Sequence, residues 1–102
     1  MIMMINKTLV FDMDGTIADL YAVENWLPML RSEDSTPYRV ARPMYEMAEL
    51  AELLNLLKAD GWKVVVTSWS SKQASREYDK RVRAAKVAWL KKYGFPADEI
   101  HV

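Results

Sequence analysis

The sequence predicts an α/β protein in which a small parallel sheet is flanked by helices. Two short apolar runs are each closed by polar residues, and a long amphipathic segment lies between them. Both runs are continuously apolar rather than alternating, which is typical of strands that are buried on both faces, as in parallel sheets. A chain of 102 residues has room for one small domain, residues 1–102, and not for a second.

The predicted elements alternate along the chain as strand, helix, strand, helix and strand. The first strand ends at Asp12, because Gly15 accepts the positive φ of the tight turn that follows. The second strand is a β-branched run that ends at Thr67. The expected ranges are 7–12, 63–67 and 100–102 for the strands, and 43–60 and 74–93 for the helices.

The two long helices are predicted from the spacing of their apolar residues. Pro43 suits the first turn of one helix and Gly61 ends it, while Gly94 ends the other. The apolar faces consist of Met44, Met47, Leu50, Leu54 and Leu57 in the first helix and of Tyr78, Val82, Ala85 and Trp89 in the second. The methionines of these faces, and those at the start of the chain, are expected in the core.

An insert at about residues 20–43 separates the first strand from the first long helix. Residues 21–30 are expected to form a short helix, and the polar stretch 31–37 an irregular turn. The insert either shapes a substrate pocket or is an ordinary surface loop. The side chains in question are Tyr21, Trp26, Tyr38, Arg39 and Arg42.

Composition excludes several classes of protein and site. Basic and acidic residues number 14 each, so no global charge attracts nucleic acid or an anionic membrane. Cysteine is absent, which excludes disulfides, thiol catalysis and thiolate metal sites. No apolar run approaches the ~20 residues of a membrane-spanning helix, and the apolar start is too short for a signal peptide. A cytoplasmic protein is the expectation.

Polar side chains follow both predicted strands where each strand ends. Asp12 and Asp14 lie two residues apart, so on extended backbone their carboxylates point toward one site. Two close anions are tolerated beside a divalent cation or when one carries a proton, and both arrangements serve phosphoryl transfer. Thr67 and Ser68 lie at the corresponding end of the second strand, where hydroxyl and amide groups can donate to phosphate oxygens.

Other interpretations of these residues stay open at this point. The Asp-x-Asp pair with its glycine is also compatible with a simple polar turn. Thr67 and Ser68 are alternatively helix caps, a role that Ser70 or Ser71 would also fill. Trp69 either stacks on a flat substrate group such as a nucleobase or is packed in the protein.

The basic residues of the last predicted helix are expected to form a solvated face rather than a nucleic-acid surface, because the chain is neutral overall. These residues are Arg76, Lys80, Arg81, Arg83 and Lys86. His101, the single histidine, has no evident partner and is expected to be structural.

The run Phe11-Asp12-Met13-Asp14-Gly15-Thr16, after an apolar strand, resembles the first signature of the haloacid-dehalogenase superfamily, and Val64-Val65-Val66-Thr67-Ser68 resembles the second. The two occur in the family's order, separated by an insert and a long helix, so the resemblance covers essentially the whole chain. It implies a Rossmann-like core of parallel strands with flanking helices, and it makes the insert a small cap.

The resemblance also implies roles for individual residues. Asp12 would be the nucleophile that forms an aspartyl-phosphate, and Asp14 the acid that protonates the leaving oxygen and then the base that activates water. The Asp12 carboxylate and the Asp14 backbone carbonyl would hold Mg²⁺. Thr67 would orient the phosphoryl group, which Ser68, Met13 and Gly15 would help to bind. An aspartate at the second position favours phosphatase chemistry over dehalogenation.

Two parts of the family pattern are not found. One is a lysine near the phosphoryl oxygens, for which Lys72, Lys86, Lys91 and Lys92 are available but unassigned. The other is an acidic cluster after a fourth strand, and the pair 98–99 lies at the wrong end of the sheet to replace it. The chain is therefore interpreted as truncated after the third strand, which leaves one edge of residues 9–11 unpaired and open to self-association.

The sequence thus predicts a magnesium-dependent phosphohydrolase that acts on a small phosphorylated metabolite or a nucleotide. The alternative is a catalytically inactive fragment or binding module that keeps the first half of the fold and lacks the residues that complete the metal site.

Overall fold

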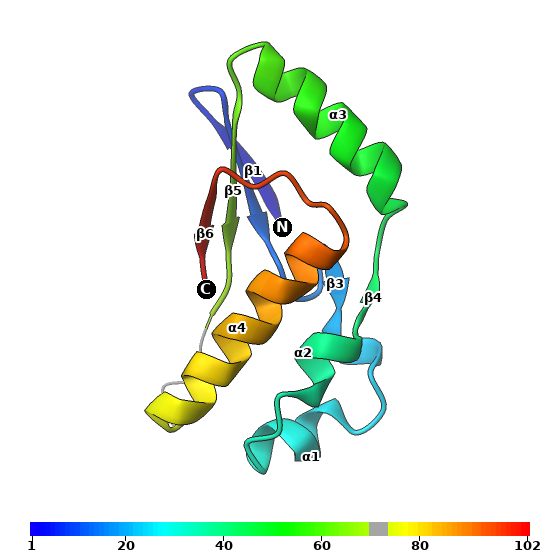
Figure 1. Ribbon diagram of the computed structural model, residues 1–102, viewed down its shortest axis with the longest axis vertical. Helices are drawn as coiled ribbons and strands as arrows, with labels where there is room; N and C mark the ends of the chain where they lie inside the picture. Colours follow the sequence, from blue (N-terminus) through cyan, green and yellow to red (C-terminus); the bar gives the residue numbers. More distant parts are fainter. Residues whose placement is uncertain (70–73) are drawn as a thin grey trace.

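The computed structural model describes residues 1–69 and 74–102 and has a mixed α/β architecture. Its main sheet has four strands in the order β1-β2-β5-β6 (Figure 1). The strand bounds are Ile2–Ile5 for β1, Thr8–Asp12 for β2, Lys63–Thr67 for β5 and Glu99–His101 for β6. Three of these strands are parallel, and β1 is antiparallel to β2.

Two helices connect the parallel strands and cover one face of the sheet. Helix α3 (Met47–Ala59) leads from the insert into β5, and α4 (Arg76–Lys92) leads from β5 to β6. One buried cluster joins the covered face of the sheet to both helices. It includes Leu9, Phe11, Val64 and Val66 from the strands and Met47, Leu54, Trp89 and Leu90 from the helices. The main core therefore lies between the sheet and these helices.

The predicted strands and helices are present, with shifted ends. The range of β5 is confirmed, and β2 begins one residue later than predicted. The predicted start of the first long helix at Pro43 is wrong, because Arg42–Pro43 form strand β4, which pairs with β3 (Ala18–Asp19). The helix begins at Met47 because the Glu46 carboxylate accepts hydrogen bonds from the amides of Ala48 and Glu49. Met44 is consequently exposed rather than part of the core.

Helix α4 begins after its own capping residue. The hydroxyl of Ser75 accepts from the amide of Tyr78, so Ser75 is the N-cap. Ser70, Ser71 and Lys72 lie outside the described residues. Strand β6 starts one residue earlier than predicted, because Glu99 already pairs with Val65 of β5.

The insert contains more regular structure than predicted. It consists of the 3₁₀ turn η1 (Leu20–Ala22), helix α1 (Trp26–Arg31) and helix α2 (Thr36–Val40). A single helix over 21–30 is wrong because Asn25 adopts a left-handed conformation with φ 62°. The stretch 31–37 is not wholly irregular, because Pro37 lies in the first turn of α2, where its missing N–H costs nothing.

Strand β1 corrects two expectations about the start of the chain. The predicted free edge of β2 is paired, since Ile2 faces Phe11 and Ile5 faces Thr8. The free edge on this side belongs to β1 instead. The methionines expected in the core are exposed here, because Met3 and Met4 lie in the edge strand β1 and Met1 directly precedes it: Met1, Met3 and Met4 expose 66%, 41% and 70% of their surface. None of the helices in the described part of the chain is both long and apolar enough to cross a membrane.

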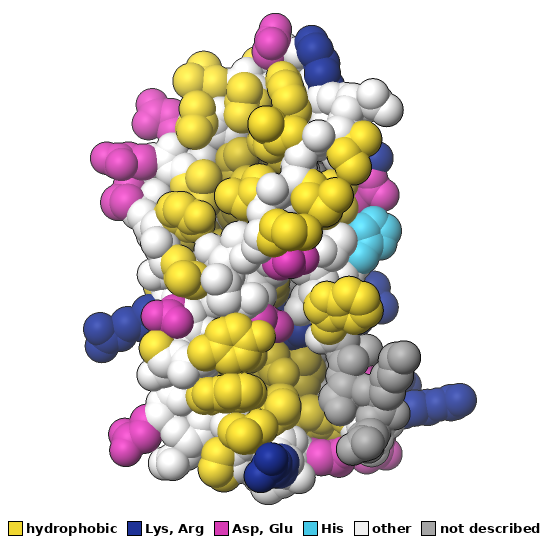
Figure 2. Space-filling model, turned by 180° about the vertical axis from the view of Figure 1, so that it is seen from behind, with side chains coloured by type: hydrophobic (Ala, Val, Ile, Leu, Met, Phe, Trp, Pro, Cys, Tyr) yellow, Lys and Arg dark blue, Asp and Glu magenta, His cyan; other side chains and the backbone are white. Residues whose placement is uncertain are grey.

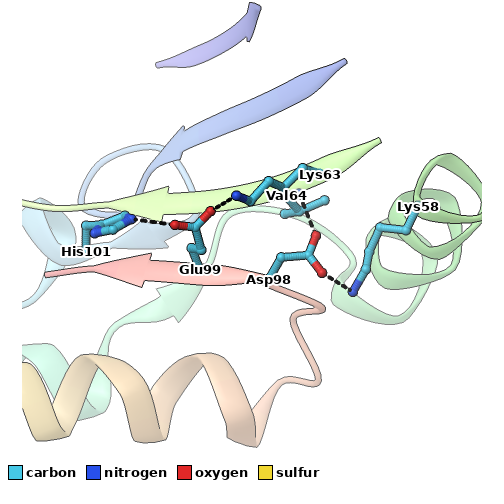
Figure 3. A network of polar contacts seen from close by, with 6 residues as sticks. All are labelled: Lys58, Lys63, Val64, Asp98, Glu99 and His101. Atoms are coloured by element: carbon cyan, nitrogen blue, oxygen red, sulfur yellow. Dashed lines mark hydrogen bonds and ion pairs between the residues drawn. The ribbon is translucent and has the colours of Figure 1, made fainter. Parts of the chain in front are cut away.

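A polar network ties β5, β6 and α3 together at the end of the sheet where β5 begins (Figure 3). The Asp98 carboxylate accepts from the Val64 amide at 2.8 Å and pairs with the Lys58 ammonium at 3.1 Å. Lys63 forms an ion pair with Glu99, whose carboxylate also contacts His101. The hydrogen bond from Val64, and then Lys58, lower the pKa of Asp98 below its usual value. Acidic residues 98–99 thus stabilise the fold, at the end of the sheet away from Asp12.

Replacing Asp98 by alanine is expected to lower the free energy of unfolding at neutral pH by about 1–2 kcal/mol, since a charge-assisted hydrogen bond is lost. A carboxyl whose pKa is lowered in the folded state stabilises above its unfolded pKa and loses this effect as the pH falls through the folded pKa. The difference between wild type and D98A, measured by urea unfolding, should therefore shrink on acidification below about pH 4. Glu52→Ala, on the exposed part of α3, is the control and should change little at any pH.

Candidate functional site

The two carboxylates lie at the carboxyl end of β2, beside the end of β5. Parallel pairing places Asp12 opposite Thr67, and the Thr67 hydroxyl donates to Asp12 Oδ1 at 3.2 Å. The Ser68 hydroxyl donates to Asp14 Oδ2 at 3.0 Å. The structure thus brings together the residues of both sequence motifs, at the edge of the sheet where ligands bind in open α/β proteins.

The turn after β2 fixes the direction of the second carboxylate. Gly15 has φ +79°, and a Cβ atom there would lie 2.8 Å from the Tyr21 ring, so both its conformation and its contact require glycine. The amides of Ile17 and Ala18 both donate to the Met13 carbonyl, which closes the turn. Asp14 is held above the end of the sheet as a result.

Lys86 of α4 is the site residue that the sequence did not assign. Its side chain is 2% exposed, and Nζ lies 3.3 Å from Asp14 Oδ2. Nζ also donates to the Ser68 hydroxyl at 2.5 Å and to the Trp69 carbonyl at 3.3 Å, and it lies 4.9 Å from the centre of the Tyr38 ring. The expectation that Lys86 belongs to a solvated basic face is therefore wrong. A signal was present, because Lys86 follows Val82 by four residues on the apolar face of the helix.

Lys86, Ser68 and Asp14 form one connected polar group. An ammonium buried to this extent needs a compensating charge, and the Asp14 carboxylate supplies it. Ser68 links the two, because its hydroxyl accepts from Lys86 and donates to Asp14. Helix α4 is thereby connected to the turn after β2 and to the end of β5 at once.

Asp12 is the more accessible of the two carboxylates. Its side chain is 39% exposed, against 16% for Asp14. Asp12 Oδ2 also forms an ion pair with the α-amino group of Met1 at 3.4 Å. The described residues contain no group of three or more acidic, histidine or cysteine side chains that could hold a metal ion by themselves. Mg²⁺ commonly takes one or two carboxylates and completes its shell with water and phosphate, so this donor set fits the ion.

A cavity of about 430 Å³ opens beside the carboxylates. Its lining includes Asp12, Asp14 and Ser68 together with aromatic side chains from the insert and from both sides of residues 70–73. These aromatic residues are Tyr21, Trp26, Tyr38, Trp69 and Tyr78. Figure 2 shows hydrophobic side chains gathered at the end of the molecule that carries α1, α2 and the start of α4. Three side chains of the insert, Tyr21, Trp26 and Tyr38, therefore form one wall of the cavity.

The wall formed by the insert is held against α4. Leu20 and Tyr38 pack with Tyr78, Val82 and Ala85 in a second buried cluster. The Tyr78 hydroxyl donates to the Asp34 carbonyl at 3.2 Å, and the Glu33 carboxylate accepts from both the amide and the hydroxyl of Ser75. Burial raises the pKa of Tyr38, and the negative charge of Asp14 adds to this effect, so its phenol stays neutral.

Several predicted site residues lie elsewhere or are already engaged. Arg39 donates to Ser35 and Thr36 of its own segment, and Arg42 lines a different hollow. The Met13 amide donates to the Thr67 carbonyl and the Gly15 amide to the Ala18 carbonyl, so both predicted phosphate donors are paired within the chain.

The side chains of Trp69 and His101 are both exposed. Trp69 is not packed, since 88% of its surface is exposed. The His101 side chain is exposed and contacts the Glu99 carboxylate, while the His101 backbone carbonyl accepts from the Ser68 amide at 2.9 Å.

Comparison of the chain with models of known protein families, with characterised proteins and with solved structures found no match. The site is therefore interpreted from its own geometry.

The contact between Lys86 and Asp14 predicts energetic coupling between α4 and the turn after β2. The substitutions D14N and K86M should each destabilise the protein, and in a double-mutant cycle their effects should deviate from additivity by about 1–3 kcal/mol. Urea unfolding of the four proteins measures this coupling. Lys80→Met, on the exposed face of the same helix, is the control and should be additive with D14N. Additive effects of D14N and K86M would contradict a direct interaction.

Proposed function

We propose that this protein is a magnesium-dependent phosphohydrolase of the haloacid-dehalogenase type, acting on phosphate monoesters through an aspartyl-phosphate. The observation that supports it is the convergence of Asp12, Asp14, Thr67, Ser68 and Lys86 at the carboxyl ends of two parallel strands. On this proposal β2, β5 and β6 with α3 and α4 correspond to the first half of the family's Rossmann-like core.

Asp12 is proposed as the nucleophile because it is the exposed carboxylate at the cavity. Its oxygen attacks phosphorus, a new P–O bond forms to Asp12, and the bond to the leaving oxygen breaks. Asp14 gives its proton to that oxygen. In the second step Asp14 takes a proton from water as the water attacks phosphorus, which releases inorganic phosphate and regenerates Asp12.

Lys86 and Thr67 are proposed to assist the transfer, Lys86 through its charge and Thr67 through its hydrogen bond to Asp12. The Lys86 ammonium, held by Ser68 beside Asp14, would supply positive charge that attracts the phosphoryl group. The Thr67 hydroxyl, already hydrogen-bonded to Asp12, orients the attacking carboxylate. Bound Mg²⁺ would neutralise charge on the transferred group, and the Asp12 carboxylate and the Asp14 backbone carbonyl would hold it.

A second candidate function is a binding module without catalysis. The observation in its favour is that the described residues contain no group of three acidic or histidine side chains that could hold a metal ion, and β1 occupies the place beside β2 where the resemblance puts a fourth strand. Such a protein would bind a phosphorylated ligand in the same cavity without cleaving it. The tests below separate the two functions.

Release of phosphate from 4-nitrophenyl phosphate should require Mg²⁺ and should fall by on the order of 10³-fold or more in D12N, because the nucleophile is removed. Steady-state assays with and without a chelator measure both effects. Asp60→Asn, an exposed aspartate at the end of α3, is the matched control and should keep full activity. Activity that survives D12N would exclude Asp12 as nucleophile, and inactivity of the wild type would favour the binding module.

The acid role of Asp14 predicts a dependence on the leaving group. In D14N, hydrolysis of glycerol phosphate should fall much more than hydrolysis of 4-nitrophenyl phosphate, because an alkoxide must be protonated as it leaves whereas nitrophenolate need not be. The kcat/KM ratio of the two esters, wild type against D14N, measures the effect. An equal loss for both esters would contradict the acid role and leave Asp14 as a metal-binding or structural residue.

A further inference from the structure

We infer that the cavity beside Asp12 binds a leaving group that carries a flat aromatic ring, and that the substrate class is the nucleoside monophosphates. This inference rests on the proposed function and names the substrate of that same site. The cavity is lined by aromatic rings, some of them exposed, and by the aspartates Asp12, Asp14 and Asp79.

Two exposed rings stand at the cavity where a ligand would cover them. Trp69 and Tyr21 line it and expose 88% and 57% of their surfaces, although most large apolar side chains are buried when the protein alone can cover them. Stacking of a base on such a ring contributes substantially to binding and does not depend on base identity. The exposed rings therefore favour a ligand that has a flat face of its own.

The Tyr21 ring is held by a contact with another ring, and Trp69 is held at its backbone. The Trp69 carbonyl accepts from Lys86 at 3.3 Å, which fixes the backbone that carries the indole. Tyr21 packs edge to face against Trp26, with ring centres 5.0 Å apart. A ring surface that is already positioned loses less conformational entropy when a ligand binds.

The depth and size of the cavity also suit this class of ligand. Tyr38 and Tyr78 are 9% and 2% exposed, so they belong to the buried part of the lining. The volume of about 430 Å³ falls within the range of small-molecule sites, roughly 300–1,000 Å³. Asp12 lines the same cavity, so a single ligand would place its phosphate at the carboxylate and its ring among the aromatic residues.

The charges of the lining exclude anionic leaving groups. Asp79 lines the cavity together with Asp12 and Asp14, and it would repel a carboxylate or a second phosphate on the ligand. Its oxygens are acceptors for the amino groups of a base or the hydroxyls of a sugar. A nucleoside monophosphate has a neutral leaving group and offers hydrogen-bond donors to Asp79. A nucleoside triphosphate or a sugar acid carries further negative charge and would be repelled.

The first experiment compares kcat/KM for a nucleoside 5′-monophosphate and for glycerol phosphate, with Mg²⁺ present. The nucleotide is expected to be preferred at least about tenfold, and Trp69→Ala and Tyr21→Ala should each reduce that preference by about tenfold. Tyr45→Ala is the matched control, because Tyr45 exposes 44% of its surface and lies outside this cavity. It should leave the preference unchanged.

The second experiment does not depend on catalysis. A nucleoside without phosphate is titrated into the wild type and into W69F, and tryptophan fluorescence is followed. Saturable quenching that is lost in W69F supports binding of the nucleoside beside Trp69. This holds even if no phosphate ester is cleaved. In that case only the proposed hydrolysis is contradicted. Equal hydrolysis of both esters without quenching would overturn the nucleoside inference and leave the phosphohydrolase proposal standing. No hydrolysis and no quenching would overturn both.

Discussion

Parallel pairing of β2 with β5 is the constraint on which the site depends. It places Asp12 opposite Thr67, so two segments that lie 55 residues apart in the chain end at the same edge of the sheet. A shift of one residue in this register would turn the side chains of one strand to the opposite face. Side chains alternate between the two faces along β2. Because Leu9 and Phe11 point into the core, this alternation also sets the direction of Asp12.

The helix that covers the sheet completes the site from the other side. Trp89 and Leu90 anchor α4 in the main core, and one turn earlier Lys86 reaches Asp14 and Ser68. The packing of α4 thus sets the position of the ammonium, and its charge in turn balances the half-buried carboxylate. In the proposed function, stability and chemistry depend on the same face of α4, so a change in the packing of this helix is expected to affect both.

The insert adds the aromatic wall, and its small size leaves the cavity open. Helices α1 and α2 are short, and the buried contacts of Tyr38 and Leu20 with α4 hold this part of the chain in place. Since the carboxylates and the rings line one cavity, recognition of a ring and chemistry at a phosphate belong to a single ligand in the proposed function. The Glu33–Ser75 and Tyr78–Asp34 contacts are the polar ties that keep the wall beside the site.

The parallel strands, the two long helices and the juxtaposition of Asp12 and Asp14 with Thr67 and Ser68 could be predicted from local patterns, because apolar periodicity and turn residues act over short distances. The sequence did not determine the partner of β2 on its other side, since the exposed apolar residues of β1 resemble core residues in composition. Nor did the sequence place Lys86 beside Asp14 or predict that the Trp69 side chain is exposed. Both depend on which residues meet after α4 packs on the sheet, and only the tertiary structure decides that.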